Sequence, residues 1–419
     1  MSRINVEKYE SCVGALGNVL SWYNFALFMP FLHVISSEFF PLENAACREV
    51  LSLFAMSIGL FTRPLGAAIF GPIGDKFGRR KAISISVLLM AIPTVGIGLL
   101  PNYEKIGILS PILLILLRAM QGISLGGEYA AAMVHLVECA PSNRRGFYGS
   151  LSDAGSQVGV LISGQALVLL YAFFSQNEIY SFAWRIPFLF GIILLPFVFL
   201  IPGNAQPQNK EKPKESVFRA LRMYKKEVLC TISITSFSAV GFYTLLTFLP
   251  YYLVSNDMLS LKEATTCSVY STLVMIIFIL IGGYFSDSCS RKKLMRFGIV
   301  GVTMAIYAMF LLNIRSFQGW IILQMVYGAC IGVYYSGRSV FFSDAFPPHI
   351  RCTAVSLSLS LAQAIFGGMI SIVMAQLTKI SLFLSIIPIT CVSCFALIAL
   401  TVLKEKDSVT VHQGADAQN

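Results

Sequence analysis

Four ionisable side chains lie deep inside long apolar stretches of this sequence, and they are the residues best placed to do chemistry. They are two arginines, Arg63 and Arg118, and two acids, Glu128 and Asp153. A charged side chain inside a hydrocarbon layer is costly unless it has a partner or a task. Two interpretations stay open: these residues neutralise one another in structural ion pairs, or they bind a charged ligand and carry a proton.

The positions of these residues along their apolar stretches place them near the middle of a bilayer. Arg118 lies 11 residues into its stretch, which is about 16 Å at the rise of an α-helix, and Arg63 lies at a similar depth. Glu128 and Asp153 lie closer to one face. Arg338 lies near the end of its stretch, so we expect its long side chain to reach the headgroup region.

The composition shows what must position these side chains. The chain has 419 residues, of which 56% are apolar and 12% are charged, with a mean hydropathy of +0.72. Soluble proteins carry about 25% charged residues. This composition excludes an ordinary cytosolic enzyme, a nucleic-acid-binding protein and a disordered chain, and it indicates a protein that crosses the lipid bilayer many times. The histidines and cysteines form no recognisable framework, so we expect no metal and no cofactor.

Twelve apolar stretches follow one another, each bounded by charge, glycine or proline. A transmembrane helix needs about 20 apolar residues, so this pattern predicts an all-α membrane protein with twelve transmembrane helices. The stretches cover residues 12–36, 49–74, 81–101, 107–138, 147–173, 184–202, 228–254, 264–286, 294–313, 318–342, 353–377 and 380–403.

The distribution of positive charge predicts the topology. If the N-terminus is cytoplasmic, 22 of the 31 lysines and arginines fall in cytoplasmic loops and tails, six fall on the other side, and three lie within spans. Cytoplasmic loops of membrane proteins carry such an excess. We therefore expect a multi-pass protein of the cell inner (plasma) membrane with both termini cytoplasmic. The N-terminal residues lack the apolar core and cleavage site of a signal peptide.

One long polar stretch divides the chain into two parts. Residues 203–227 are rich in proline, lysine and other polar residues, and they predict a cytoplasmic linker. The linker separates an N-terminal six-helix bundle, residues 1–202, from a C-terminal six-helix bundle, residues 228–403. A cytoplasmic tail over residues 404–419 follows.

An internal repeat supports this division. The sequence G-P-I-G-D-K-F-G-R-R begins at Gly71, and G-Y-F-S-D-S-C-S-R-K begins at Gly283, 212 residues later. An acid followed by an arginine seven residues later occurs after the fourth stretch, and again 206 residues further on, after the tenth. Two signals with nearly the same offset indicate a duplicated six-helix unit, with a central path between two bundles.

The charged residues of the repeat form a predicted cytoplasmic gate. Asp75 can accept hydrogen bonds from a helix N-terminus or an arginine, while Gly71 and Gly78 allow backbones to approach closely. A loop that served topology alone would need only its positive residues, so the acid favours a latch between the bundles. The predicted gate consists of Gly71, Asp75, Gly78, Arg79, Arg80, Glu138, Arg145, Asp287, Arg291, Asp344 and Arg351.

These motifs resemble those of a known family. The pattern G-x3-D-K-x-G-R-R, with its weaker copy, is similar to the signature of the major facilitator superfamily. Further motifs resemble its metabolite:proton symporter branch, which includes carriers for proline/betaine, α-ketoglutarate, citrate and shikimate. The resemblance covers nearly the whole chain and implies two pseudo-symmetric six-helix bundles that move a small polar metabolite by alternating access. The further motifs are G-N-x3-W-Y-N-F at 17–25, R-P-L-G at 63–66, R-x2-Q-G-x3-G-G-E-Y at 118–129, R-R-G-F-x-G-S at 144–150, W-R-I-P-F at 184–188 and F-P-P-H-I-R at 346–351.

The first span departs from the family pattern. Members of this branch usually carry E-W-F-D-F there, with acids where this chain has Ser21 and Asn24. Serine and asparagine cannot titrate, so any proton coupling passes to Glu128, Asp153 or His33. His33 lies near the outer end of the first span, where an interfacial histidine without a role in coupling is the other interpretation. Without such coupling the protein would be an uncoupled facilitator or an exchanger.

The net charge of the central residues predicts the substrate. The loss of two acids leaves the cavity more positive than in the resembling proteins, which favours a small carboxylate (organic acid) moved together with protons. A zwitterionic osmolyte or amino acid such as proline or betaine is the alternative, with its cationic group against Trp22 or Tyr243. The expected substrate-binding residues are Arg118, Arg63, Gln121, Asn24, Trp22, Tyr129 and Tyr243.

A channel or a membrane-embedded enzyme agrees less well with the sequence. Duplication with two latches is typical of transporters, and an enzyme would need a nucleophile with its base, or a metal cluster. The sequence contains no phosphate-binding loop for ATP. We expect a monomer whose partners are a small-molecule substrate, protons and the lipid bilayer, and no nucleic acid.

Single cysteines at Lys210 and Asp257 should react with impermeant thiol reagents from opposite sides of the membrane. The charge distribution places Lys210 in the cytoplasm and Asp257 outside. The measurement is labelling of intact cells and of inside-out vesicles, in a variant without its ten native cysteines. Labelling of both positions from the same side would contradict the twelve-span topology.

Overall fold

The computed structural model of the protein describes residues 3–40, 45–193, 196, 221–312, 314, 316–368 and 370–405. Nearly all of these residues are helical, and no strand occurs among them. The predicted all-α architecture is confirmed. Most of the predicted linker and tail lies outside the described residues.

The first half of the chain contains the helices of the predicted N-terminal bundle. They are α1 (Arg3–Ala26), α2 (Leu32–Phe39), α3 (Ala45–Phe61), α4 (Arg63–Phe77), α5 (Arg79–Leu99), α6 (Tyr103–Ile106), α7 (Leu109–Cys139), α8 (Arg145–Phe173), α9 (Gln176–Glu178), the π-helix η1 (Ile179–Ala183), α10 (Arg185–Leu189) and the 3-10 helix η2 (Phe190–Ile193).

The second half begins within the described residues at 221 and contains a corresponding set. Its elements are α13 (Lys225–Tyr243), the π-helix η3 (Thr244–Phe248), α14 (Leu249–Ser255), α15 (Leu261–Phe285), α16 (Arg291–Leu311), α17 (Phe317–Ala345), α18 (Arg351–Phe366), α19 (Ile370–Ile380) and α20 (Leu382–Val402).

Ten segments of the described chain are long and apolar enough to cross a membrane. They match the second to fifth and the seventh to twelfth predicted spans. The first predicted span is occupied by α1 and α2, which a turn at residues 27–31 separates. The sixth, residues 184–202, begins with α10 and then leaves the described residues.

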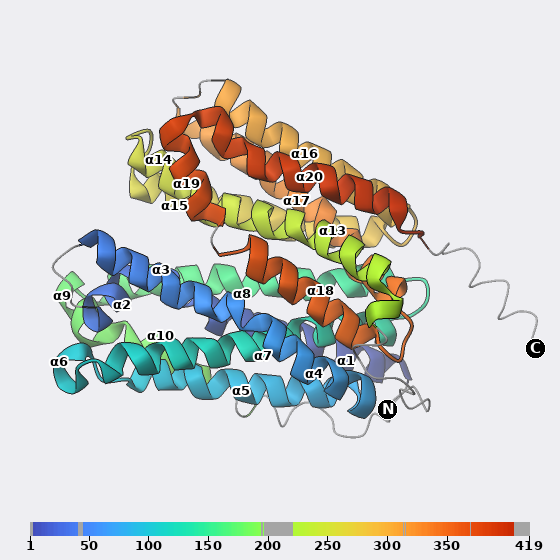
Figure 1. Ribbon diagram of the computed structural model, residues 1–419, viewed down its shortest axis with the longest axis horizontal. Helices are drawn as coiled ribbons and strands as arrows, with labels where there is room; N and C mark the ends of the chain where they lie inside the picture. Colours follow the sequence, from blue (N-terminus) through green and yellow to red (C-terminus); the bar gives the residue numbers. More distant parts are fainter. Residues whose placement is uncertain are drawn as a thin grey trace, which may run out of the picture.

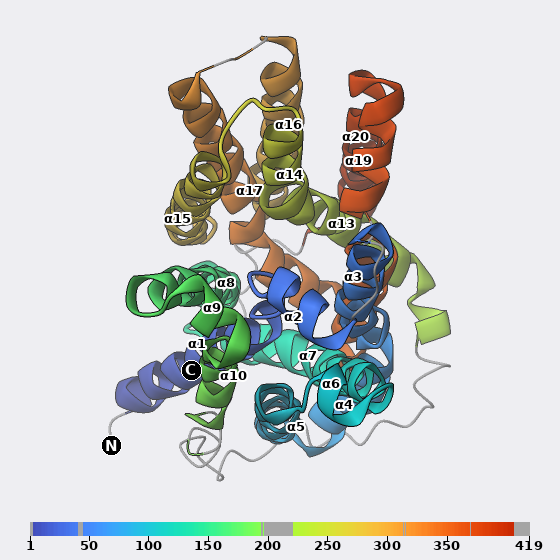
Figure 2. The same cartoon turned by 90° about the vertical axis from the view of Figure 1, so that its left-hand side faces the viewer.

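The two halves form two groups of long helices that lie along a common axis. In Figure 1, α1 to α10 (blue to green) form the lower group and most of α13 to α20 (yellow-green to red) form the upper group. The end view in Figure 2 shows the same division. α18 packs against α4 and α7 of the first half, and α8 packs against α15 and α17 of the second. Residues from both halves therefore meet along these six helices.

A break between α3 and α4 positions the first buried arginine. The helix is interrupted at Thr62, directly before Arg63, and Pro64 lacks the N–H that would continue the hydrogen-bond ladder. The Thr62 hydroxyl lies 3.0 Å from the carbonyl oxygens of both Ile58 and Ala119. The second contact ties the break to α7.

Glycines on α7 allow a close approach to this break. A Cβ atom on Gly126 would lie 2.0 Å from the carbonyl oxygen of Arg63, and one on Gly122 would lie 2.1 Å from that of Gly59. Only glycine permits backbones to come this near, and small residues serve this purpose in membrane helices. The contact brings Glu128, two residues beyond Gly126, next to α4.

A π-helical segment follows Tyr243, the residue of the second half that the sequence predicts for the substrate site. Tyr243 ends α13, and η3 then runs to Phe248. Pro250 in the first turn of α14 has no N–H to donate to the carbonyl four residues earlier. Such π-helical turns are frequent at functional sites, which draws attention to Tyr243.

Candidate functional site

Residues from α1, α4, α7 and α13 form a cluster near the middle of the molecule. The guanidinium carbon of Arg63 lies 5.6 Å from the centre of the Trp22 ring. Glu128, Tyr129 and Tyr243 are electrostatic neighbours of Arg63. These five residues, which we call the central cluster, were all predicted from the sequence.

Three members of the central cluster contain buried polar atoms that make no hydrogen bond of ordinary geometry. They are Nε and Nη1 of Arg63, both carboxylate oxygens of Glu128, and Nε1 of Trp22. Arg63 is 1% exposed, Glu128 is 0% exposed and Trp22 is 7% exposed. Ser21 and Arg63 are polar neighbours of Glu128, yet in the part of the chain that the structure describes no direct ion pair joins Arg63 to Glu128.

Buried groups without partners are suited to a ligand that supplies the partners. Burying an unpaired polar or charged group costs about 1–3 kcal/mol or more, so a ligand that satisfies such groups gains affinity. A guanidinium can bind a carboxylate through two parallel N–H···O bonds. The face of an aromatic ring can hold a cation, and a buried carboxylate can take up a proton.

Arg118 uses its hydrogen-bond donors within the protein. Its Nη1 donates to the carbonyl oxygen of Phe25 at 3.2 Å and to Oε1 of Gln121 at 2.7 Å, and its Nη2 donates to the carbonyl oxygen of Met56 at 3.3 Å. The guanidinium also lies over the rings of Phe25 and Phe28. These contacts fasten α1 and α3 to α7. Through its terminal nitrogens Arg118 therefore binds residues outside the central cluster, while its buried Nε makes no hydrogen bond.

Gln121 and Asn24, also predicted for the substrate site, make their hydrogen bonds to residues outside the central cluster. Nε2 of Gln121 donates to Oγ1 of Thr94 at 2.8 Å. Nδ2 of Asn24 donates to the carbonyl oxygen of Leu20 at 2.7 Å, and the residue lines a separate pocket. Asn24 is two positions from Trp22, which is about 200° around an α-helix, so the two side chains point to different sides of α1.

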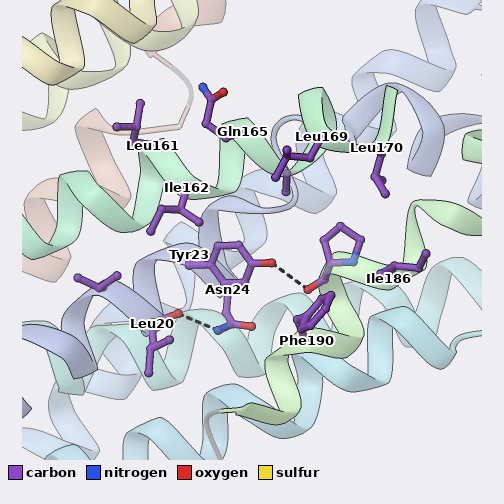
Figure 3. Close-up of a pocket in the computed structure, with 13 residues that line it drawn as sticks. Leu20, Tyr23, Asn24, Leu161, Ile162, Gln165, Leu169, Leu170, Ile186 and Phe190 are labelled. Atoms are coloured by element: carbon purple, nitrogen blue, oxygen red, sulfur yellow. Dashed lines mark hydrogen bonds between the residues drawn. The ribbon is translucent and has the colours of Figure 1, made fainter. Parts of the chain in front are cut away.

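The pocket beside Asn24 has a volume of about 450 Å³ and lies among α1, α8 and α10 (Figure 3). The Tyr23 hydroxyl donates to the carbonyl oxygen of Pro187 at 3.1 Å across one wall. Most other lining side chains are apolar, and Leu169 and Phe190 are 59% and 55% exposed. In a transmembrane protein such a surface faces lipid. The pocket therefore does not suit a charged substrate.

Asp153 forms an ion pair with Arg338 from the other half of the chain. Nη2 of Arg338 bonds to the Asp153 carboxylate and to the Tyr129 hydroxyl. Arg338 is 1% exposed, so the prediction that it reaches the headgroup region is wrong. The arginine lies seven residues, about 10 Å, from the end of α17, and it finds an acid at similar depth on α8.

At one end of the molecule, Asp75 binds the start of a helix from the other half. Its carboxylate accepts hydrogen bonds from the backbone N–H groups of Cys352 at 3.0 Å and Thr353 at 2.9 Å, and from the Thr353 hydroxyl at 2.6 Å. These residues begin α18. A carboxylate is favourable there because the first N–H groups of a helix lack partners and carry partial positive charge.

Asp287 makes the reciprocal contact in the opposite direction. Its carboxylate accepts hydrogen bonds from the backbone N–H groups of Gly146 at 2.5 Å and Phe147 at 3.1 Å, which begin α8. Cys352 and Thr353 lie 206 residues after this pair, the offset of the second repeat signal. Burial raises the pKa of the Asp287 carboxyl group, and the two backbone hydrogen bonds oppose that shift.

Ion pairs between arginines and acids surround these two contacts, and two of them join the halves. The pairs are Arg79–Asp75 at 2.8 Å, Arg79–Glu138 at 3.2 Å, Arg351–Glu138 at 2.7 Å and Arg145–Asp344 at 2.7 Å. We call Asp75, Asp287 and these ion pairs the latch, and the end of the molecule where they lie the latch end.

Gly71 and Gly78 serve the latch in different ways. A Cβ atom on Gly71 would lie 2.6 Å from Cα of Thr353, so glycine permits the close approach of α18. Around Gly78 no atom lies within 4 Å of the Cβ position, and the residue has a φ of 97°. The prediction that Gly78 allows close packing is therefore wrong. Glycine at position 78 instead permits the left-handed turn between α4 and α5.

Arg80 and Arg291, also predicted for the gate, lie in the first turns of α5 and α16. The backbone N–H of Arg291 and the hydroxyl of Ser290 each donate to the carboxylate of Glu405 at 2.7 Å. Glu405 was not among the predicted gate residues, because it lies in the predicted tail and no repeat signal marks it. Its contact adds the end of α20 to the latch end.

Comparison with known proteins decides the family. The chain matches the description Major Facilitator Superfamily over residues 14–271 and 232–418. The chain belongs to the major facilitator superfamily. The twelve-helix fold is therefore shown, and the protein is a multi-pass membrane transporter rather than an enzyme.

Similar proteins include two whose names state a substrate. A protein of Staphylococcus aureus (strain COL), named putative proline/betaine transporter, is 32% identical over 385 residues, which cover 88% of this chain and 82% of the relative. The proline/betaine transporter of Escherichia coli (strain K12) is 30% identical over 375 residues, which cover 84% of this chain and 74% of the relative.

A solved structure supports the fold independently. The proton:xylose symporter XylE bound to 6-bromo-6-deoxy-D-glucose superposes with a TM-score of 0.80, covering 96% of this chain and 95% of that one, at 16% sequence identity. The inward open conformation of the xylose transporter XylE from E. coli gives a TM-score of 0.66 at 17% identity, covering 96% and 95%. At these identities the likeness shows the fold alone.

Replacing Asp75 by asparagine should weaken the latch without preventing membrane insertion. The amide loses the negative charge that binds Arg79 and the first turn of α18. Hydrogen bonds to charged groups contribute about 1.5–3 kcal/mol each, so the turnover of transport should fall about tenfold while substrate affinity changes little. The measurement compares uptake with binding in liposomes at matched protein amounts. Lys76→Gln, which removes an exposed neighbouring charge, is the control, and equal turnover in all three proteins would assign this loop to topology alone.

Proposed function

We propose that the protein transports a small zwitterion, of the class that includes proline and betaine, by alternating access. The observation that carries this proposal is the central cluster, where Nε and Nη1 of the buried Arg63 and both carboxylate oxygens of the buried Glu128 make no hydrogen bond of ordinary geometry. The names of the similar proteins support the same substrate class. This proposal replaces the organic acid favoured by the sequence.

The arginines limit the charge that a substrate can carry. Three of them lie at depth, but Arg118 donates to backbone carbonyls and Gln121, and Arg338 is paired with Asp153. Nε makes no hydrogen bond in any of the three, but Arg63 also leaves a terminal nitrogen, Nη1, without one. One guanidinium matches one carboxylate, and a second carboxylate on the substrate would meet no free cation among the three. A substrate with a single carboxylate therefore fits best.

The aromatic residues of the site suit the cationic end of a zwitterion. The Trp22 ring lies edge to face with Tyr129, at 5.6 Å between centres, and with Phe242, at 6.3 Å. Phe242 in turn contacts Tyr243 at 5.3 Å. We place the substrate carboxylate on Arg63 and its ammonium group against these rings, where a desolvated cation gains about 2 kcal/mol.

Glu128 is the acid that we propose for proton coupling. Asp153 is engaged by Arg338, Tyr129 and Ser339, whereas neither oxygen of Glu128 makes a hydrogen bond of ordinary geometry. Charged Glu128 competes with a substrate carboxylate for Arg63, because the two residues are electrostatic neighbours. A proton on Glu128 removes that competition. Proton and substrate would then bind together, which is the linkage that symport requires.

The direction of opening follows from the latch and the predicted topology. We propose that the latch end is cytoplasmic and that this conformation is closed on that side, so the central cluster exchanges with the opposite side first. The central cluster draws residues from both halves of one chain, so we propose that the monomer is the transporting unit. The proposed membrane is the plasma membrane, with both termini inside.

Matched substrates separate a zwitterion carrier from an organic acid carrier. Two analogues of proline each lack one charged group: cyclopentanecarboxylate lacks the ammonium group, and pyrrolidine lacks the carboxylate. Competition with labelled proline or betaine uptake should be at least about tenfold weaker for each analogue than for proline, because each loses one of the two charged contacts. Stronger uptake of cyclopentanecarboxylate than of proline would restore the organic-acid prediction.

Arg63→Lys should raise the KM for the zwitterion about tenfold or more. Lysine keeps the positive charge but loses the planar pair of donors that binds a carboxylate. Arg222→Lys, at an exposed position three residues before α13, is the matched control and should leave KM unchanged. If Arg63→Lys transports with the KM of the wild type, Arg63 does not hold the carboxylate.

Glu128→Gln should abolish accumulation driven by a pH gradient while substrate exchange survives. The amide imitates the protonated acid, so Arg63 stays open to the substrate, but the proton can no longer be released. Counterflow and gradient-driven uptake in the same liposomes measure the two activities. Glu104→Gln, an exposed acid, is the control, and Asp153→Asn tests the other acid. Gradient-driven accumulation at the wild-type level in Glu128→Gln would exclude Glu128 as the coupling site.

A further inference from the structure

A second group of buried polar residues joins the two halves between the central cluster and the latch. One oxygen of the Asp153 carboxylate receives the Tyr129 hydroxyl at 2.5 Å and Nη2 of Arg338, and the other receives the Ser339 hydroxyl at 2.9 Å. Nη1 of Arg338 reaches the Ser238 hydroxyl at 3.3 Å. Tyr129 and Asp153 belong to α7 and α8 of the first half, and the other three belong to α13 and α17 of the second.

The depth of this group places it above the latch. Arg338 lies seven residues before the end of α17, and Asp153 lies eight residues after the start of α8. Both positions are about 10–12 Å from the latch end at the rise of an α-helix. Arg63 lies twelve residues before Asp75, or about 18 Å. The charged pair therefore sits between the substrate residues and the latch.

The environment of this pair differs from that of the latch pairs. The side chains of Arg338 and Asp153 are 1% and 0% exposed, whereas those of Arg145 and Asp344 are 26% and 16% exposed. Arg145 and Asp344 gain water as soon as they part. A fully buried ion pair that loses one partner leaves an uncompensated charge in a medium of low polarity. α8 and α17 can therefore separate only if water or another group replaces the lost partner.

We propose that Tyr129, Asp153, Arg338 and Ser339, which we call the clasp, form an inner gate of the transport path. The clasp closes the path below the central cluster, and it breaks each time the path opens toward the latch end. This inference goes beyond the identity of the substrate and does not depend on it, because it follows from contacts between the two halves.

Tyr129 connects the clasp to the central cluster, and this step rests on the proposed function. Its ring lies 5.6 Å from the centre of the Trp22 ring, and its hydroxyl bonds to both charged residues of the clasp. A substrate that displaces the Trp22 ring therefore acts on the residue that orients Asp153 and Arg338. Tyr129 is a positioning residue for the gate as well as a wall of the site.

Two single-cysteine probes can report opening at the two ends. Ser150 on α8 lies toward the latch end, and its hydroxyl is 2.2 Å from the Cβ position of Gly283 in the other half. Ser57 on α3 lies toward the opposite end, and its hydroxyl is 3.1 Å from the Cβ position of Gly368 in the other half. Both serines are at most 3% exposed. Each is replaced by cysteine in a variant without native cysteines, and modification by an impermeant thiol reagent is timed from both sides of liposomes.

Arg338→Met and Asp153→Asn should each speed modification of Ser150→Cys about tenfold or more and slow that of Ser57→Cys. Reciprocal changes are expected because loss of the clasp shifts the population toward the conformation open at the latch end. The double variant should show no larger effect than one single variant, since both remove the same interaction. Arg296→Met, an arginine outside the clasp that is partly exposed, is the control for the same side-chain change.

The outcomes separate a gate from a structural support. Faster modification at both probes would mean that these residues only hold the fold together, and unchanged rates would mean that the pair does not control opening; either result overturns the proposal. Tyr129→Phe and Ser339→Ala remove one hydroxyl each and keep the buried charges paired, so they should give smaller shifts of the same reciprocal kind even if the charge variants fail to insert. The probes need no substrate, so the result stands apart from the zwitterion assays.

Discussion

A charge buried between membrane helices must either meet a partner inside the protein or receive one from a ligand, because the surrounding hydrocarbon supplies none. This constraint separates the three deep arginines. Arg338 meets Asp153, and Arg118 meets carbonyl oxygens of α1 and α3. Arg63 lies beside Glu128 without a direct bond. Within this set Arg63 is thus the arginine that leaves a terminal nitrogen, Nη1, without a partner, and the proposed charge of the substrate rests on this difference.

The duplication of the chain explains why the latch has two equivalent parts. Asp75 of the first half binds the start of α18, and Asp287 of the second half binds the start of α8. The arrangement is self-complementary, as in a symmetric dimer whose two copies are joined in one chain. Each half supplies a carboxylate and receives one at a helix N-terminus. Neither half can tilt away at the latch end without breaking both contacts, so the two parts open together.

Features that depend on position along a helix could be predicted from the sequence. Contacts that depend on which side of a helix a residue faces could not. Span positions, the repeat and the acids of the latch are linear patterns, and ten spans lie within the described residues. The sequence prediction grouped Asn24 with Trp22, two residues earlier, whereas in the structure Asn24 lines a separate pocket together with Tyr23. Arg338 was placed at the headgroups because its acid partner lies 185 residues away in sequence. No pattern within one helix shows that pairing.

The three layers of polar contacts differ in what must happen when they open. The two ion pairs of the latch that join the halves, Arg145–Asp344 and Arg351–Glu138, have side chains that are 11–26% exposed, so water can solvate their charges as soon as they part. Asp153 and Arg338 are fully buried, and parting them without water would leave two bare charges. Water must therefore reach the clasp before or while it breaks, and the path for that water is the gap left by the opened latch. The latch then has to open first, the clasp second, and the central cluster becomes accessible last. Closing in the reverse order removes water from the site before the opposite side opens, which keeps the two sides of the membrane from being connected.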